Sequence, residues 1–235
     1  MRISTAEFVA IMAMLVATVA ISIDGLLPAL SIIAKELTPL RPNNAQIILS
    51  SFVAGMAIGT LIVGPLSDSY GRKPIIYGGA FIYILTSVVC VVSQSLELIL
   101  VARFLQGVGA SAPRVVAQAL VRDFYKGREM ARISSFIMIV FALVPAVAPL
   151  LGSFVMFAFD WRAIFFMFIA FVAISTIWMG LRINETISEE NRVKFNLRNL
   201  VSAFREVLSN PLILSAVTTL VFAYSILFVG IFLIQ

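Results

Sequence analysis

The chain has 235 residues, of which 61% are hydrophobic and only 12% are charged, a composition that excludes a water-soluble globular domain. It contains no histidine and a single cysteine, Cys90, which excludes disulfide frameworks, imidazole metal sites and Ser-His or Cys-His catalysis. We therefore expect a membrane protein that uses no metal or cofactor and is not an enzyme. The formal net charge of +5 would suit nucleic acid unless the cations lie on one side of a membrane.

Apolar runs long enough to cross a bilayer recur along the whole chain. A spanning helix needs about 20 mostly apolar residues. Runs of this kind predict seven transmembrane helices, over residues 8–31, 45–66, 75–94, 97–121, 132–157, 162–182 and 211–235.

The connections between these runs alternate between rich and poor in lysine and arginine. Most cations fall in the N-terminus and in the even-numbered connections. Because cytoplasmic loops carry the excess of Lys and Arg, this pattern predicts a cytoplasmic N-terminus in a multi-pass protein of the cell inner membrane. The basic charge is then explained without nucleic acid.

Residues 183–210 differ from the other connections because they are long, polar and charged with both signs. We interpret them as a cytoplasmic central linker. It separates a six-helix bundle over residues 1–182 from a seventh helix over residues 211–235. No polar flank follows the seventh run, so the sequence predicts the start of a second, truncated bundle.

Two charged residues fall at similar depth inside predicted spans. Asp24 lies near the outer end of the first span, and Arg103 lies a similar distance into the fourth. At about 1.5 Å per residue, both are roughly 9 to 11 Å from the outer surface, so we expect them to pair. Ionisable groups at such depth typically mark an ion or proton path. Without histidine, the carboxylate of Asp24 is the natural proton carrier.

A polar stripe runs along the fourth span. Arg114 follows Arg103 by 11 residues, which returns the helix to within roughly 20° of the same face. Polar residues on such a face contact water or other helices rather than lipid. Either a substrate cavity or a structural polar network would explain the stripe, whose remaining members are Gln106, Gly107 and Gln118.

The connection between the second and third spans reads GPLSDSYGRK over residues 64–73. It resembles the G-x-L-x-D-R-x-G-R-[RK] signature of the major facilitator superfamily, with Ser69 where the family often has arginine. In that family the motif latches the two halves in the outward-open state. Glycines would allow close helix approach and a tight turn. We expect Arg122 to pair with Asp68, in a latch formed by Gly64, Asp68, Gly71, Arg72, Lys73 and Arg122.

Further segments extend the resemblance over essentially all 235 residues. Residues 103–110 (RFLQGVGA) are similar to the R-x-x-Q-G-x-G-A motif, whose arginine is implicated in proton transfer. Residues 24–30 (DGLLPAL) look like the end of span one in drug:proton antiporters with twelve spans. Residues 161–165 (WRAIF) and 184–186 (NET) resemble the start of span six and the segment after it. Residues 121–125 (VRDFY) and 148–152 (APLLG) look most like the Bcr/CflA-type drug-resistance branch.

The fifth span bears on the direction of transport. Antiporters of the superfamily carry G-x-x-x-G-P-x-x-G-G there, and this chain keeps Pro149 and Gly152 but replaces three of the glycines. Pro145 and Pro149 would weaken the helix, so a bend or a gating contact is one interpretation. A proline kink without a role in direction is the other.

The resemblance implies an all-α membrane protein made of the N-terminal six-helix bundle of a major facilitator, the linker and the first helix of the C-terminal bundle. It also implies proton-coupled export of hydrophobic or cationic small molecules by alternating access, with the missing C-terminal half, protons and lipid as partners. Alternatives are proton-coupled import of a small anionic metabolite and an inactive half-transporter. A retinal photoreceptor would need a lysine in residues 211–235, which contain none. An intramembrane enzyme would need paired carboxylates or histidine.

Overall fold

The computed structural model describes residues 3–188, 190, 192–193, 195–196, 202, 205–206 and 208–233, and among these all side chains except those of Pro42, Tyr224 and residues 227–233. The chain divides into two compact units, Met1–Val193 and Lys194–Gln235. The first unit therefore continues beyond residue 182, where the predicted bundle ends. Part of the predicted linker, including residues 197–201, lies outside the described residues.

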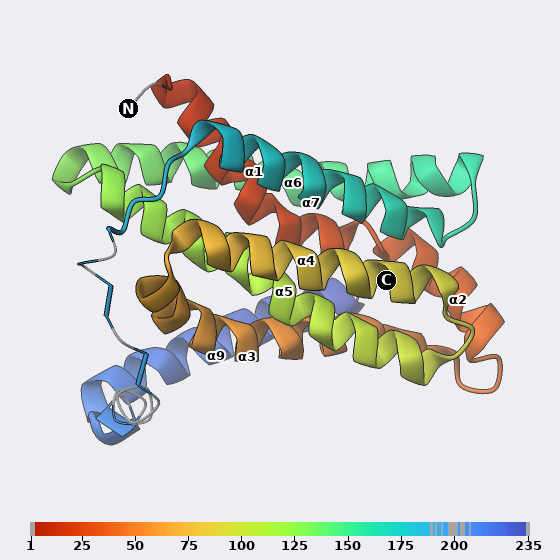
Figure 1. The fold of residues 1–235 in the computed structure, drawn as a ribbon. Helices are drawn as coiled ribbons and strands as arrows, with labels where there is room; N and C mark the ends of the chain where they lie inside the picture. Colours follow the sequence, from red (N-terminus) through yellow and green to blue (C-terminus); the bar gives the residue numbers. More distant parts are fainter. Residues whose placement is uncertain are drawn as a thin grey trace. The chain divides into compact units, whose positions relative to one another are not determined.

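The first unit is a bundle of helices, and every regular element described in it is helical (Figure 1). It contains six helices that are long and apolar enough to cross a membrane, which confirms six of the predicted spans. The first span comprises α1 (Thr5–Asp24), a 3-10 turn (Leu27–Ala29) and α2 (Leu30–Leu37). A second 3-10 turn (Pro42–Gln46) leads into α3 (Ile47–Tyr70), followed by α4 (Arg72–Val92), α5 (Leu96–Phe124), α6 (Gly127–Ala158) and α7 (Ala163–Arg182).

Local sequence explains where several helices begin and end. Ser4 and Ser95 cap α1 and α5 by accepting hydrogen bonds from the N–H groups of Glu7 and Leu98. Gly71 separates α3 from α4 with a φ of 102°, a conformation that residues with a Cβ rarely adopt. Most helices extend beyond the predicted spans because polar residues continue the helix after the apolar run has ended.

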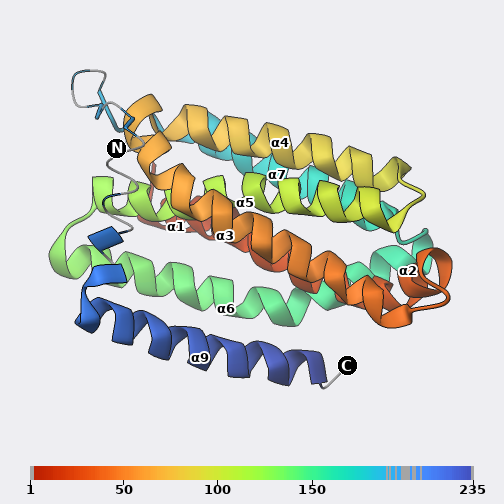
Figure 2. The same cartoon turned by 90° about the horizontal axis from the view of Figure 1, so that it is seen from below.

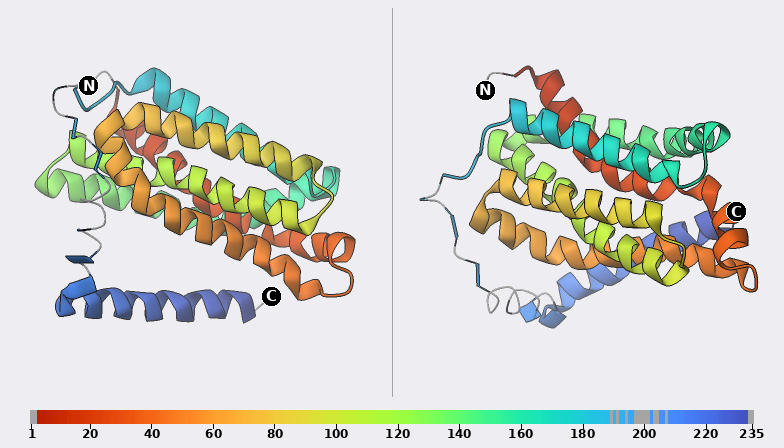
Figure 3. Two further views of the ribbon diagram at one scale, coloured as in Figure 1. Left: turned by 60° about the horizontal axis from the view of Figure 1, so that its bottom comes forward. Right: turned by 45° about the vertical axis from the view of Figure 1, so that its right-hand side comes forward.

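The first span is interrupted, where a single helix was predicted over residues 8–31. The α-helix ends at Asp24, next to Gly25, and Pro28 follows within the 3-10 turn. Proline lacks the N–H that would continue the hydrogen-bond ladder. Gly152 of α6 packs against this break, and a Cβ at Gly152 would lie only 2.1 Å from the carbonyl oxygen of Gly25. Figure 3 shows the change of direction between α1 and α2.

Helix α5 contacts α1, α3, α4 and α6, and therefore occupies the interior of the bundle. Figure 2 shows α3, α5 and α4 running side by side. Small residues allow α3 and α5 to approach closely. A Cβ at Gly55 would lie 1.8 Å from the carbonyl oxygen of Phe104, and one at Gly107 would lie 2.0 Å from that of Phe52.

We expect Gly107→Ala to destabilise the bundle by about 3 kcal/mol, because the new methyl group would overlap main-chain atoms that cannot rotate away. Thermal unfolding of the purified protein in detergent measures the effect. Gly64→Ala is the matched control, since no atom lies within 4 Å of a Cβ there, and the higher helix propensity of alanine should leave stability equal or slightly higher. Equal unfolding temperatures for the two variants would contradict the close α3–α5 contact.

The second unit contains α9 (Pro211–Leu233), which has helical structure where the seventh span was predicted. Within it, Pro211–Ala223 qualifies as a shorter apolar helix. That the helix crosses the membrane stays a prediction.

Candidate functional site

Arg103 is completely buried in the middle of the bundle. Its Nη1 donates to Oε1 of Gln106 at 2.6 Å, and its Nη2 donates to the main-chain carbonyl oxygen of Ser22 at 2.9 Å. The guanidinium carbon lies 4.4 Å from the ring centroid of Phe52, a cation–π distance. Arginine keeps its proton in proteins, so these contacts hold a buried positive charge.

Residues of α4 hold the acceptors of Arg103 in place. Gln106 donates from Nε2 to the hydroxyl of Ser87 at 2.6 Å. The hydroxyls of Ser22 and Tyr83 are 2.5 Å apart, which ties α1 to α4 next to the carbonyl that Arg103 uses. We call Ser22, Tyr83, Ser87, Arg103 and Gln106 the arginine network. Tyr83 and Ser87 were not among the predicted site residues, although their spacing of four residues places both on one face of a helix.

The charge of Arg103 is not neutralised by any described carboxylate within 4.0 Å, and its Nε has no hydrogen-bond partner. Burying an ion without a counter-ion is costly, and dipoles offset only part of the cost. The arginine network is therefore a place where a carboxylate would bind favourably.

Asp24 does not form the predicted ion pair with Arg103 in this structure. It is the last residue of α1, half-buried, and the guanidinium instead contacts the carbonyl of Ser22, two residues earlier. The main chain turns away after Asp24 because the helix breaks at Gly25. Arg103 thus contacts the last turn of α1, which contains Asp24, but forms no ion pair with the Asp24 carboxylate.

The predicted polar stripe of α5 divides between two environments. Gln106 is fully buried in the arginine network, and Gly107 lies against α3; that they line a substrate cavity stays a prediction. Helical periodicity identifies residues on one face but not what covers that face. Arg114 is half-buried and contacts Met56, its Nη1 lying 3.4 Å from Sδ. Gln118 is exposed and lines a cavity between α1, α5 and α6.

The turn between α3 and α4 carries a group of charged contacts centred on Arg72, which is buried. Its Nη1 donates to the hydroxyl of Ser67 and to Oδ1 of Asp68, both at 2.6 Å. Its Nε donates to Oδ2 of Asp123 at 3.1 Å. The structure does not show the expected pairing of Asp68 with Arg122, because Arg72, four residues after Asp68 and across the break at Gly71, pairs with that carboxylate. Arg122 faces the cavity with Gln118 instead.

Glu185 fastens the segment after α7 to the same turn. Its carboxylate accepts the N–H of Arg72 at 2.9 Å and that of Lys73 at 3.0 Å, at the start of α4. It also accepts the N–H groups of Thr186 and Ile187. Burial alone would raise the pKa of this carboxyl, but these four donors outweigh burial and hold its pKa below the ordinary value.

Further contacts complete this group. The Thr186 hydroxyl donates to Asp123 at 2.7 Å, and Nζ of Lys73 donates to the carbonyl of Gly180 at 2.8 Å. Glu185 and Thr186 were noted in the sequence only because residues 184–186 resemble the segment that follows span six in the family. Nothing in a single sequence shows that these two residues reach the turn. Gly64 does not mediate close approach, since a Cβ placed there would meet no neighbouring helix or side chain within 4 Å. We define the turn cluster as Ser67, Asp68, Gly71, Arg72, Lys73, Asp123, Glu185 and Thr186.

Pro145 and Pro149 lie inside α6, which is assigned as one continuous helix. Near these prolines, Gly152 of α6 packs closely against Gly25, at the break beside Asp24. A bend or a gating contact was one interpretation of this part of the sequence. A close contact is present, and its role in gating stays a prediction.

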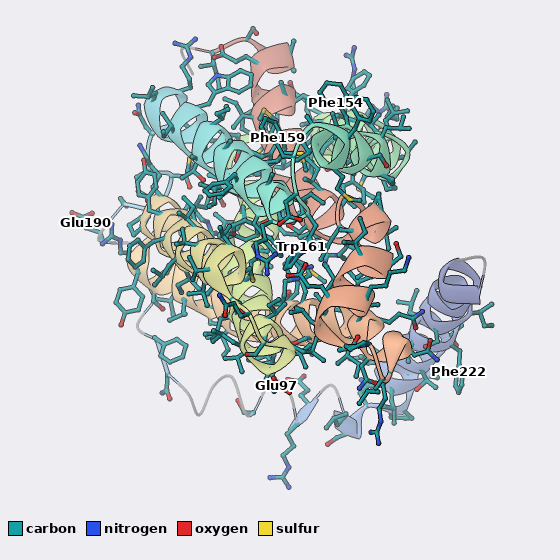
Figure 4. The ribbon with its side chains drawn as sticks, turned by 90° about the vertical axis from the view of Figure 1, so that its right-hand side faces the viewer. Glu97, Phe154, Phe159, Trp161, Glu190 and Phe222 are labelled. Atoms are coloured by element: carbon teal, nitrogen blue, oxygen red, sulfur yellow. The ribbon has the colours of Figure 1, made fainter. Side chains whose placement is uncertain are left out.

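At the end of the bundle opposite the turn cluster, Trp161 and Arg162 hold two segments together. Trp161 is buried and points inward among the helix ends, whereas Phe154 and Phe159 point outward (Figure 4). Its Nε1 donates to Glu36 at 2.7 Å, and Arg162 donates to the other oxygen of the same carboxylate at 2.7 Å. This pair joins α2 to the α6–α7 connection.

Within the described part of the chain, no group of three or more His, Cys, Asp or Glu residues is arranged to hold a metal ion. The site consists of buried polar groups on membrane-length helices. These features define a multi-pass helical membrane protein whose bundle interior carries charge.

Comparison with known proteins identifies the family. The Major Facilitator Superfamily profile matches residues 10–235. The chain therefore belongs to the Major Facilitator Superfamily, a family of membrane transporters rather than enzymes.

Two of three similar proteins carry names that refer to drug resistance. The chain is 36% identical over 182 residues to the bicyclomycin resistance protein homolog of Haemophilus influenzae, covering 77% of this chain and 46% of that protein. It is 37% identical over 161 residues to multidrug resistance protein MdtL of Escherichia coli O157:H7, covering 68% and 40%. The uncharacterized MFS-type transporter YdgK of Bacillus subtilis is 34% identical over 193 residues, covering 81% and 48%. The chain thus spans about half the length of these relatives.

The fold is similar to that of a solved transporter. The crystal structure of the human organic anion transporter MFSD10 (TETRAN) matches with a TM-score of 0.67 and 18% identity, covering 91% of this chain and 55% of that one. This likeness supports the fold alone.

Proposed function

We propose that residues 1–235 form the N-terminal half and first C-terminal helix of a proton-coupled exporter of drug-like small molecules in the inner membrane. The observation that carries the proposal is the buried Arg103, which has no described carboxylate partner and binds the carbonyl of Ser22, two residues before Asp24. Such a charge is costly to bury, and ionisable groups inside spans typically mark ion or proton paths. The drug-resistance names of the relatives favour export of drugs.

Proton coupling would arise from two arrangements of Asp24 and Arg103. In one, represented here, Arg103 is bound to the Ser22 carbonyl and Asp24 is free to be protonated. In the other, an ionised Asp24 carboxylate occupies the unused Nε of Arg103. Moving between them changes the proton affinity of Asp24, because a nearby guanidinium favours the charged carboxylate. Since Gly152 packs against Gly25, the same change would be transmitted to α6.

The turn cluster would stabilise one of the two global states by fastening α3, α4, α5 and the segment after α7 together. Its charges lie at the end of the bundle that carries most of the cations, which we propose faces the cytoplasm, as does the N-terminus. Substrate would bind near the midplane between the two halves of the complete transporter. For that reason we expect residues 1–235 alone not to transport.

The test uses the full-length protein that carries this chain, reconstituted in proteoliposomes. With an acidic interior and a neutral exterior, an antiporter should accumulate labelled bicyclomycin or another drug inside, in exchange for protons that leave. Nigericin with potassium, which removes the pH gradient, should abolish the accumulation. Accumulation only when the exterior is the acidic side would establish proton-coupled import and overturn the proposal.

A further inference from the structure

A second charged feature of the bundle lies outside the arginine network and the turn cluster. A cavity of about 280 Å³ opens between α1, α5 and α6 near the α5–α6 turn. Apolar and sulfur-containing side chains form much of its wall, with three polar side chains among them. The residues that matter for binding are Met12, Gln118, Arg122, Met130, Ser134 and Met138.

The side chains of this wall would accept ligands of varied shape but would discriminate between ligands of different charge. Methionine side chains are flexible and polarisable, so they adapt to apolar groups of varied shape. Arg122 contributes the one charge in the wall, and none of the lining residues is acidic. No described carboxylate lies within ion-pair distance of its guanidinium. A ligand that carries a cation would meet repulsion here, whereas one that carries an anion would meet an available partner.

The positive charge continues along α5 toward the middle of the membrane. Arg114, Gln118 and Arg122 are spaced four residues apart, so they lie on successive turns of one broad face. The polar contact of Arg114 is with the sulfur of Met56, and it too has no described carboxylate partner. A cation in the last turn of a helix is favoured by the helix dipole, which would account for Arg122. It does not account for Arg114, which lies in the interior of α5.

We propose that the cavity formed by Met12, Gln118, Arg122, Met130, Ser134 and Met138 binds an amphiphilic substrate through its anionic group, with Arg122 as the charged contact. The inference rests on the proposed transport function and narrows its substrate class. Cationic drugs, which the family resemblance allows, do not match the charges on this face. The apolar part of the substrate packs against the methionines, and Gln118 donates a further hydrogen bond.

Three probes that share one naphthalene ring test the proposal, differing only in the head group: a carboxylate, a primary amide and a trimethylammonium. Equilibrium binding to the purified full-length protein is measured without a pH gradient. We expect the carboxylate to bind about tenfold more tightly than the ammonium, and Arg122→Gln to weaken carboxylate binding about tenfold while leaving amide binding unchanged. Arg122→Lys should retain most of the carboxylate affinity.

Arg128→Gln is the matched control, because Arg128 is an exposed cation at the same end of the bundle that does not line the cavity. Tightest binding of the ammonium probe, or equal effects of Arg122→Gln and Arg128→Gln on the carboxylate, would overturn the proposal. Retained amide binding in Arg122→Gln shows that the variant is folded. Because the assay needs no gradient, failure of proton-driven transport and failure of this inference give different results.

Discussion

Replacing Arg103 with alanine is expected to reduce proton-driven transport by roughly 100-fold. A hydrogen bond between a buried guanidinium and a carboxylate contributes up to about 3 kcal/mol, which corresponds to that factor. Without the guanidinium, Asp24 would no longer have a state in which its ionised form is stabilised. Transport is measured in proteoliposomes with an acidic interior, normalised to the amount of folded protein.

The structure also predicts how this variant differs from a merely unstable one. Arg103→Ala removes an unneutralised buried charge, so the unfolding temperature should fall much less than for Gly107→Ala. Arg103→Lys keeps the charge, but a single amine cannot reproduce the forked contacts to Gln106 and Ser22, so transport should be intermediate. Transport at the wild-type rate by Arg103→Ala would remove Arg103 from the mechanism.

The second large effect is expected for Arg72→Ala. The change leaves Asp68 and Asp123 without their shared cation and Ser67 without its donor, with an expected loss of roughly 2 to 3 kcal/mol from the state that the turn cluster stabilises. Opening of the turn can be followed with Ser69→Cys and a membrane-impermeant maleimide, since the natural Cys90 is buried. Labelling should accelerate more than tenfold, and transport should decrease.

The matched control for Arg72→Ala is Lys126→Ala, which removes an exposed cation from the α5–α6 turn at the same end of the bundle. It should change neither labelling nor transport. If Ser69→Cys reacts equally fast in the two variants, the contacts of Arg72 do not hold the turn closed.

The apolar runs were sufficient to predict the six membrane-length spans of the first unit, because a bilayer imposes a minimum length on any helix that crosses it. The interruption after Asp24 was harder to place. Gly25 and Pro28 are visible in the sequence, but membrane helices often tolerate both residues. At the break, Gly152 of α6 packs against the carbonyl oxygen of Gly25, and this contact depends on tertiary packing.

Several residues of the candidate site could be predicted from the sequence, but the contacts between them could not. Arg103 and Arg72 are identifiable because charges within or next to spans are rare. Their partners on other helices are not, since Ser22 of α1 and Asp123 of α5 are brought to them by helix packing. Gln106 and Gln118 have the same residue type on the same helix, yet only packing against α3 and α4 distinguishes a buried structural amide from one that lines a cavity.

The central claim is that Asp24 carries the proton whose movement drives the substrate. The most direct test compares wild-type and Asp24→Asn full-length protein in proteoliposomes with an acidic interior, recording substrate uptake and internal pH together. Wild type should accumulate substrate and alkalinise the interior. Asp24→Asn should exchange labelled for unlabelled substrate at equilibrium but neither accumulate it nor change the internal pH. Gradient-driven accumulation by Asp24→Asn at the wild-type level, with the same proton efflux, would contradict the account.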